Sequence, residues 1–209
     1  MLIPFNKLTK AFNLKISGIL HVGAHECEEL KDYIQYNLNS NQIYWVEAME
    51  HKVLQMKNQN IENIYQAFVD DVDNKEITFN ISNNGQSSSL LEFGTHTIHH
   101  PEVKFTKTIQ GKTKRLDTLI EENNIPIQDI NFLNLDIQGV ELRALKSMEK
   151  YLSNVDYIYT EINTDYVYKD CNLVGEIDEY LKKFNFTRIA TRLAGNAGWG
   201  DAFYIKQKK

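Results

Sequence analysis

Short apolar runs alternate along this chain with segments whose apolar residues recur at helical spacing. We expect buried strands at 18–22, 44–48, 64–69, 132–137 and 155–162, and helices at 26–38, 50–60, 115–122, 141–152 and 173–184. A strand that is apolar on both faces is typical of a parallel sheet covered by helices on each side. The alternation of strand and helix therefore predicts an α/β fold.

The pattern changes in two places. Residues 76–82 and 103–109 alternate polar and apolar positions, which is typical of half-exposed antiparallel strands that could pair with each other. Two further strands, 186–193 and 201–206, are joined by a glycine-rich loop and predict a closing hairpin. We expect one domain over 1–209, with a lead-in at 1–17 and an insert or lid at 76–110. Its core is a doubly wound, mostly parallel sheet of about seven strands with an antiparallel edge strand from the C-terminal hairpin.

Composition narrows the classes of function. The chain has 209 residues, 42% of them hydrophobic, and no apolar run long enough to cross a membrane. Its net charge of −5, without a basic stripe, argues against nucleic acid as the main partner. The first residues lack the features of a signal peptide, so we expect a cytoplasmic protein. Cys27 and Cys171 lie far apart and lack metal-ligand spacing, which favours free thiols.

The most informative stretch is 19–30, read together with Glu47. A buried strand ends at Gly23, a helix follows, and the next buried strand ends in an acid. This order is the skeleton of a nucleotide-binding βαβ unit, in which the acid accepts the ribose hydroxyls. An ordinary α/β turn with a solvated Glu47 is the alternative. The dinucleotide fingerprint needs further glycines, and their absence disfavours an NAD-dependent oxidoreductase.

Candidate functional residues gather where strands end. In a doubly wound sheet, ligands bind at the carboxyl ends of the parallel strands. The residues expected at that edge are Gly23, Glu47, Asp70, Asp136 and Glu161. Nearby in the insert lie His96, His99 and His100, but no recognised metal-ligand set accompanies them. A lid whose histidines meet substrate is the interpretation we favour for that segment.

Several motifs resemble the FkbM family of O-methyltransferases, which belong to the class I S-adenosylmethionine-dependent enzymes. Leu20-His-Val-Gly-Ala-His25 resembles the first motif of that family, and Trp45-Val-Glu-Ala48 resembles its ribose-binding strand end. Asn134-Leu-Asp-Ile-Gln-Gly-Val-Glu-Leu142 resembles the hallmark D-x-E/Q-G-x-E, and Gly198-Trp-Gly-Asp-Ala202 resembles a common C-terminal motif. Ser87-Ser-Ser-Leu-Leu91 resembles a serine-rich segment often found there. The resemblance extends over about residues 18–206.

The resemblance implies a site and a reaction. The cofactor would be S-adenosyl-L-methionine, its methyl group passing from sulfonium to oxygen on a sugar, glycan or related small molecule. The implied cofactor-binding residues are His21, Gly23, Ala24, His25, Glu47, Ala48 and Asp70. Asp136, Glu161 and His96 are candidate general bases, and no metal ion is expected. Tyr166, Tyr168 and Trp199 could stack on a sugar ring.

One residue departs from the family pattern. Cys27 stands where most members have glycine, and its side chain could crowd the methionine part of the cofactor. It is the feature that favours a second hypothesis, a non-catalytic methyltransferase-like binding module. The retained Glu47 and Asp136 favour an enzyme.

Overall fold

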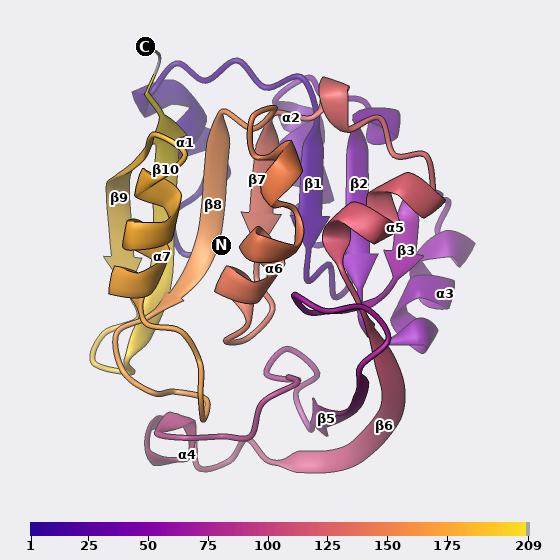
Figure 1. Ribbon diagram of the computed structural model, residues 1–209, viewed down its shortest axis with the longest axis vertical. Coiled ribbons are helices and arrows are strands. Elements are labelled where there is room, and N and C mark those ends of the chain that lie inside the picture. Colours follow the sequence, from indigo (N-terminus) through magenta and orange to yellow (C-terminus); the bar gives the residue numbers. More distant parts are fainter. Residues whose placement is uncertain (208–209) are drawn as a thin grey trace.

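The computed structural model describes residues 1–207 and has three layers, with helices on both faces of a central sheet (Figure 1). The sheet has seven strands in the order β3-β2-β1-β7-β8-β10-β9. Their bounds are β1 (Ile19–Val22), β2 (Ile43–Glu47), β3 (Ile64–Gln66), β7 (Phe132–Leu135), β8 (Tyr157–Asn163), β9 (Phe186–Leu193) and β10 (Trp199–Lys206). The predicted α/β architecture with a mostly parallel sheet is confirmed.

The C-terminal hairpin is present, but its antiparallel strand is not at the edge. Strand β10 pairs antiparallel with both β8 and β9, so it lies inside the sheet and β9 forms the edge. Because β10 runs against its neighbours, its first residues lie beside the carboxyl end of β8. Trp199 is opposite Asn163, and Asp201 is opposite Glu161.

Helices cover the two faces in two groups. One face carries α1 (Phe5–Ala11), α2 (Leu30–Gln35) and α3 (Glu50–Asn58), and the other carries α5 (Leu116–Glu122), α6 (Glu141–Ser147) and α7 (Val174–Lys182). Side chains alternate between these faces along each strand. In β1, Ile19 packs in the cluster with α1 and α2, whereas Leu20 packs in the cluster with α5 and α6.

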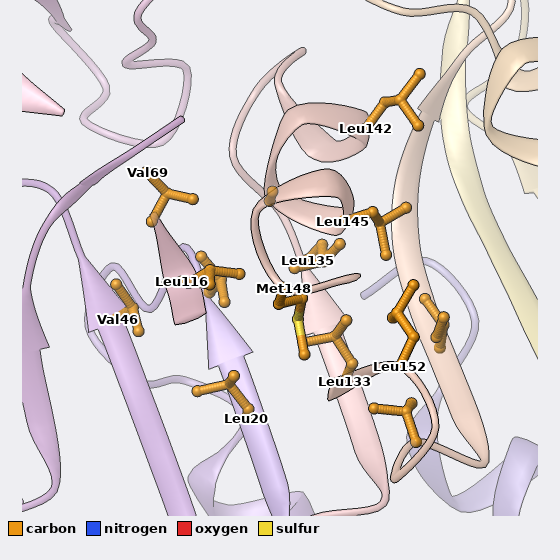
Figure 2. Close-up of a cluster of buried hydrophobic side chains, with 14 of the residues drawn as sticks. Leu20, Val46, Val69, Leu116, Leu133, Leu135, Leu142, Leu145, Met148 and Leu152 are labelled. Carbon is orange, nitrogen blue, oxygen red and sulfur yellow. The ribbon is translucent and has the colours of Figure 1, made fainter. Parts of the chain in front are cut away.

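The second cluster is the larger of the two cores (Figure 2). Leu142, Leu145 and Met148, from α6 and its end, belong to this cluster together with Leu133 and Leu135 of β7. Leu145 and Met148 are completely buried. Burying one such side chain contributes about 1.5–3 kcal/mol, so this helix fixes the turn that precedes it. The turn between β7 and α6 carries Asp136, and Glu141 is the first residue of α6.

Helices α2 and α6 are several residues shorter than the sequence pattern suggests. Helix α2 begins at Leu30 instead of residue 26, because His25 and Cys27 have φ of +44° and +55°, which a helix cannot contain. Helix α6 ends at Ser147, where the serine hydroxyl donates to the Ala144 carbonyl, and the last predicted turn is a separate 3-10 segment at Glu149–Tyr151.

The predicted strand at 64–69 is in fact two strands in different sheets. Residues Ile64–Gln66 pair with β2, whereas β4 (Phe68–Val69) pairs with β6 (Phe105–Lys114). Strand β5 (Glu76–Ser82) pairs antiparallel with β6, as the alternating pattern predicts. These three strands, with the short helix α4 (His96–His99), form an insert below the carboxyl ends of the central strands (Figure 1).

Within residues 1–207, no helix combines the length and apolar character needed to span a membrane. Both cysteines are free and buried.

Candidate active site

A cavity of about 530 Å³ opens between the carboxyl ends of the central strands and the insert. Its size is typical of a pocket for a small organic ligand. The turns after β1, β2 and β7 form one part, and β8, β10 and the insert form the rest. Of the sequence-predicted residues, the cavity is lined by His21, Gly23, His25, Glu47, Ala48, His96, Asp136 and Glu161.

The turn after β1 requires glycine at position 23. Gly23 has φ of +94°, and a Cβ placed there would lie 1.8 Å from the Asp136 carbonyl oxygen. The N–H groups of Gly23 and Ala24 both donate to the Val46 carbonyl, at 2.9 and 3.0 Å. Close packing of the turns after β1 and β7 therefore excludes any side chain at this position.

Glu47 is the buried acid at the end of β2. Its Oε2 accepts the N–H of His25 and its Oε1 accepts the N–H of Met49, each at 2.8 Å. Each carboxylate oxygen can accept two hydrogen bonds, so one site on each remains for a ligand. That arrangement suits the two neighbouring hydroxyls of a ribose. Burial raises the pKa of Glu47, and its backbone hydrogen bonds oppose that rise.

Beyond Glu47 the cavity becomes apolar. Ala48, Met49, Ala67, Phe68, Val69, Phe79 and Leu90 line this part. Several of them pack together where α3, β4 and β5 meet. An apolar slot beyond a ribose acceptor fits a purine ring, so the residues present match the adenosine part of S-adenosylmethionine.

A second group of acids follows β7 and β8. Gln138 lies between them, and its Nε2 donates to Asp136 Oδ1 and to Glu161 Oε2, both at 2.6 Å. The Tyr168 hydroxyl donates to Gln138 Oε1, also at 2.6 Å, which fixes the orientation of the amide. Burial and the nearby charge of Asp136 raise the pKa of Glu161 well above its usual range.

Glu141 stabilises the turn after β7 through hydrogen bonds to its backbone. Its carboxylate accepts the N–H groups of Ile137 and Gly139, at 3.0–3.1 Å. The side chain is almost completely buried, and burial raises its pKa to about 7. Gln138 has φ of +57° and Gly139 has φ of +105°, so these hydrogen bonds hold a conformation that L-residues rarely adopt.

Asp70, a predicted cofactor-binding residue, does not line the cavity, although the preceding Val69 does. Its buried carboxylate faces Lys75 and Arg143, with both distances 3.6 Å, and accepts the N–H of Asp71. This position follows from the switch of strand β4 into the insert sheet, which removes the acid from the edge that carries Glu47 and Asp136.

The three histidines of the insert have different surroundings. His96 lines the cavity and stacks on Phe93, with ring centroids 4.3 Å apart, and its buried Nδ1 has no hydrogen-bond partner. Burial lowers its pKa, which favours the neutral ring. His100 also lines the cavity, whereas His99 is exposed and does not. Within residues 1–207, no cluster of three or more His, Cys, Asp or Glu side chains is arranged for a metal ion.

His21 and Ala24 are buried supports of the same turn. The His21 ring lies 3.1 Å from the Tyr33 hydroxyl, and burial lowers its pKa. Ala24 is buried beneath the turn and does not line the cavity.

Cys27 does not crowd the cavity. It has φ of +55°, which explains why glycine is suited to this position, and its side chain is buried in the cluster with Tyr33 and Phe5. Burial raises the pKa of this thiol to about 12, so it remains protonated. The feature that favoured a non-catalytic module is therefore directed into the core.

Three residues of the site have roles that the sequence does not predict. Gln138 and Asp201 belong to motifs that resemble the family, and for Tyr168 the sequence suggests only stacking on a sugar ring. Asp201 lines the cavity. Its carboxylate accepts hydrogen bonds from the Leu2 N–H, at 2.5 Å, and from the Tyr159 hydroxyl. The sequence signal that could identify Asp201 as a site residue is its charge within a mostly apolar strand. Of the aromatic residues considered for stacking, Tyr168 and Trp199 line the cavity, and Tyr166 is exposed outside it.

Comparison with known proteins agrees with this geometry. The family model described as "Methyltransferase FkbM domain" matches residues 21–187. No curated protein sequence is significantly similar to the chain.

Solved structures support the fold at low sequence identity. A methyltransferase FkbM from Methylobacillus flagellatus is 12% identical, with a TM-score of 0.54, covering 90% of this chain and 43% of its own length. Magnesium protoporphyrin IX methyltransferase from Synechocystis, with bound S-adenosylmethionine, is 9% identical over 97% of this chain and 76% of its own, with a TM-score of 0.52.

TrmK from M. capricolum, in complex with S-adenosylhomocysteine, is 12% identical, with a TM-score of 0.51, covering 100% of this chain and 70% of its own. With four-fifths of its length matched by the family model, this chain belongs to the FkbM family of S-adenosylmethionine-dependent methyltransferases.

Proposed function

We propose that this methyltransferase acts on a hydroxyl group of a sugar, a glycan or a related small molecule. The observation that supports an oxygen acceptor is the pair of carboxyl groups, Asp136 and Glu161, that Gln138 joins inside the cavity. A neutral hydroxyl is a weak nucleophile until a base removes its proton, whereas a free amine has a lone pair available. A site with a built base therefore suits a hydroxyl acceptor.

On the cofactor side, the residues bind and orient. Glu47 accepts the ribose hydroxyls, the turn at Gly23 and His25 faces the methionine part, and Ala48 belongs to the apolar adenine slot. When bound, S-adenosylmethionine supplies an electrophilic methyl group.

On the acceptor side, the carboxyl pair receives the proton of the attacking hydroxyl. The raised pKa of Glu161 suits this role, because a carboxylate with a higher pKa is a stronger base. Gln138 holds the two carboxyl groups at a fixed separation, and the hydrogen bond from the Tyr168 hydroxyl prevents the side-chain amide of Gln138 from rotating by 180°. His96 forms part of the cavity wall on the side of the insert, where it can contact the acceptor.

The test is methyl transfer from isotope-labelled S-adenosylmethionine to a panel of neutral and amino-substituted methyl glycosides. The product is analysed by NMR for a methyl ether. We expect turnover to fall by about 10²–10⁴-fold in Glu161→Gln, the typical contribution of a positioned base. Affinity for S-adenosylhomocysteine should stay within about threefold, because Glu161 lies on β8 and outside the cofactor turns.

Glu179→Gln is a suitable control, because Glu179 is exposed on α7 and does not line the cavity. Methylation at nitrogen, or undiminished turnover in Glu161→Gln, would contradict the proposal.

A further inference from the structure

The peptide group between Gln138 and Gly139 is held at both of its polar ends by buried side chains. Its N–H, on Gly139, donates to both carboxylate oxygens of Glu141, at 3.1 Å. Its C=O, on Gln138, accepts a hydrogen bond from Ser89 Oγ at 2.7 Å. Because the N–H and the C=O of one peptide group point in opposite directions, these two contacts together define the orientation of its plane.

The hydroxyl of Ser89 is fully committed to this region of the fold. Ser89 is 1% exposed, and its Oγ also accepts the N–H of Leu91 at 3.0 Å. A serine hydroxyl has a single hydrogen to donate, and here the Gln138 carbonyl receives it. Ser89 does not line the cavity. Its hydroxyl therefore acts on the turn after β7 from behind the cavity wall.

Ser89 belongs to the insert, 49 positions before Gln138 in the chain. Its backbone N–H and C=O pair with Asn80 of β5, at 3.0 and 2.9 Å, and the Asn80 side chain donates to the Leu91 carbonyl at 3.2 Å. Leu91 also packs on the turn, since a Cβ placed at Gly139 would lie 3.1 Å from its Cδ1. The sheet of the insert thus reaches the turn after β7 through residues 89–91.

The conformation of this turn needs such support. Gln138 has φ of +57°, in the left-handed region that non-glycine residues rarely occupy. Gly139 follows with φ of +105°, and because glycine has no Cβ, the peptide group between them can rotate with little steric resistance. From the observed backbone, the Gln138 amide donates to both Asp136 and Glu161, at 2.6 Å. The position of the amide between these carboxyl groups therefore depends on the orientation of this peptide group.

From these contacts we propose that Ser89 is a positioning residue of the active site. Its hydroxyl fixes the left-handed turn at Gln138 and thereby holds the Gln138 amide between the two carboxyl groups. The insert therefore does more than enclose the cavity, because one of its serines aligns the carboxyl pair at the ends of the central strands. This inference rests on the proposed function, in which that pair receives the proton of the acceptor.

The first test is a double-mutant cycle with Ser89→Ala, Gln138→Met and the variant that carries both. Methionine has about the length of glutamine and lacks the amide. Turnover is measured with the most active of the methyl glycosides while both substrates are varied. We expect Ser89→Ala to lower kcat by about tenfold, the effect of one misplaced hydrogen-bonding group, and to leave the KM for S-adenosylmethionine within about twofold.

The two effects on kcat should not multiply. Once the amide is absent, loss of the serine hydroxyl has no amide left to displace, so the double variant should match Gln138→Met within about twofold. Ser82→Ala is the matched control. Ser82 is another buried serine of the insert, its Oγ donates to Asn84 Oδ1 at 2.7 Å, and it does not line the cavity. Its kcat should equal that of the wild type.

The second test needs no acceptor. Hydrogen exchange of the Gln138 side-chain amide is followed by NMR in the full chain saturated with S-adenosylhomocysteine. Both amide hydrogens are hydrogen-bonded in the wild type, and we expect their exchange to become about tenfold faster in Ser89→Ala. Ser89→Cys keeps the size of the side chain but donates only weakly, so it should show the same change without loosening the packing. Ser82→Ala should exchange as the wild type does.

The proposal is overturned if both Ser89 variants keep the wild-type kcat and exchange rate, or if Ser89→Ala slows Gln138→Met by the same factor as it slows the wild type. It is also overturned if Ser82→Ala lowers kcat as much as Ser89→Ala, because any loss of a buried hydroxyl in the insert would then suffice. Failure of the proposed function would be recognised separately, as absence of methyl ether formation by the wild type or as undiminished turnover in Glu161→Gln.

Discussion

Replacing Glu47 with glutamine changes one atom of a side chain whose hydrogen bonds are all defined. Both carboxylate oxygens accept a backbone N–H at 2.8 Å, and each retains one site for the ribose. The glutamine amide has one oxygen, so its NH₂ group must face either the His25 N–H or the Met49 N–H. Glu47→Gln therefore loses one buried backbone hydrogen bond in the fold, and in the complex its hydrogen bonds to the ribose are no longer strengthened by a charge.

The expected loss of cofactor affinity follows from the second of these. A hydrogen bond to a charged group contributes about 1.5–3 kcal/mol, which corresponds to a dissociation constant about 10–150-fold higher. Isothermal titration of wild type and Glu47→Gln with S-adenosylhomocysteine measures this change directly. The free energy of unfolding, measured in urea, should fall by about 1–3 kcal/mol for the backbone donor left without a partner.

Glu62→Gln provides the matched control. Glu62 is exposed and does not line the cavity, so the same chemical change there should leave both quantities unaltered. A change of less than about threefold in the affinity of Glu47→Gln would refute the assignment of this carboxylate to the ribose.

Further predictions address the turns and the core. Gly23→Ala should lower the free energy of unfolding by more than about 2 kcal/mol in urea titration, because its Cβ would overlap the Asp136 carbonyl; a stable variant that still binds S-adenosylhomocysteine would contradict the packing described. Burial raises the pKa of Glu141 to about 7, so the folded chain retains a proton that the unfolded chain releases. This group therefore makes the unfolding free energy decline as pH rises from about 4.5 to about 7, and Glu141→Gln should remove that decline; parallel curves for the two proteins would disprove it. Leu145→Ala should cost about 2–5 kcal/mol by thermal or urea unfolding, and a loss below about 1 kcal/mol would mean that the core of Figure 2 can collapse around the gap.

Most strands could be predicted because their signals in the sequence are local. Strand β5 has the bounds that its alternating pattern indicates, and the glycine turn lies where the apolar run of β1 ends. The run at 64–69 shows the limit of such signals. The run contains no glycine or proline, but after Gln66 the hydrogen-bonding partner changes from β2 to β6, which lies some forty positions later in the chain. No pattern within the run itself specifies that exchange.

The candidate site shows the same division. Asp136 and Glu161 could be placed from strand ends alone, because carboxyl ends of parallel strands share an edge. Gln138 could not be assigned its position between them, since this depends on a left-handed backbone at a non-glycine residue. Asp201 could not be placed either, because β10 is antiparallel and presents its beginning to the cavity. The side-chain direction of Cys27 likewise depends on a positive φ that the sequence does not indicate.

The position of β10 between β8 and β9 also has a consequence for how enzymes of this shape diversify. One wall of the cavity depends on the register of this hairpin, since a shift of a single residue would turn Asp201 and Trp199 to the opposite face of the sheet. The adenosine side is built from other connections, after β1, β2 and β3. A lengthened or shortened loop at 194–198 can therefore reshape this wall of the cavity while the turns after β1 and β2, including Glu47, keep their structure.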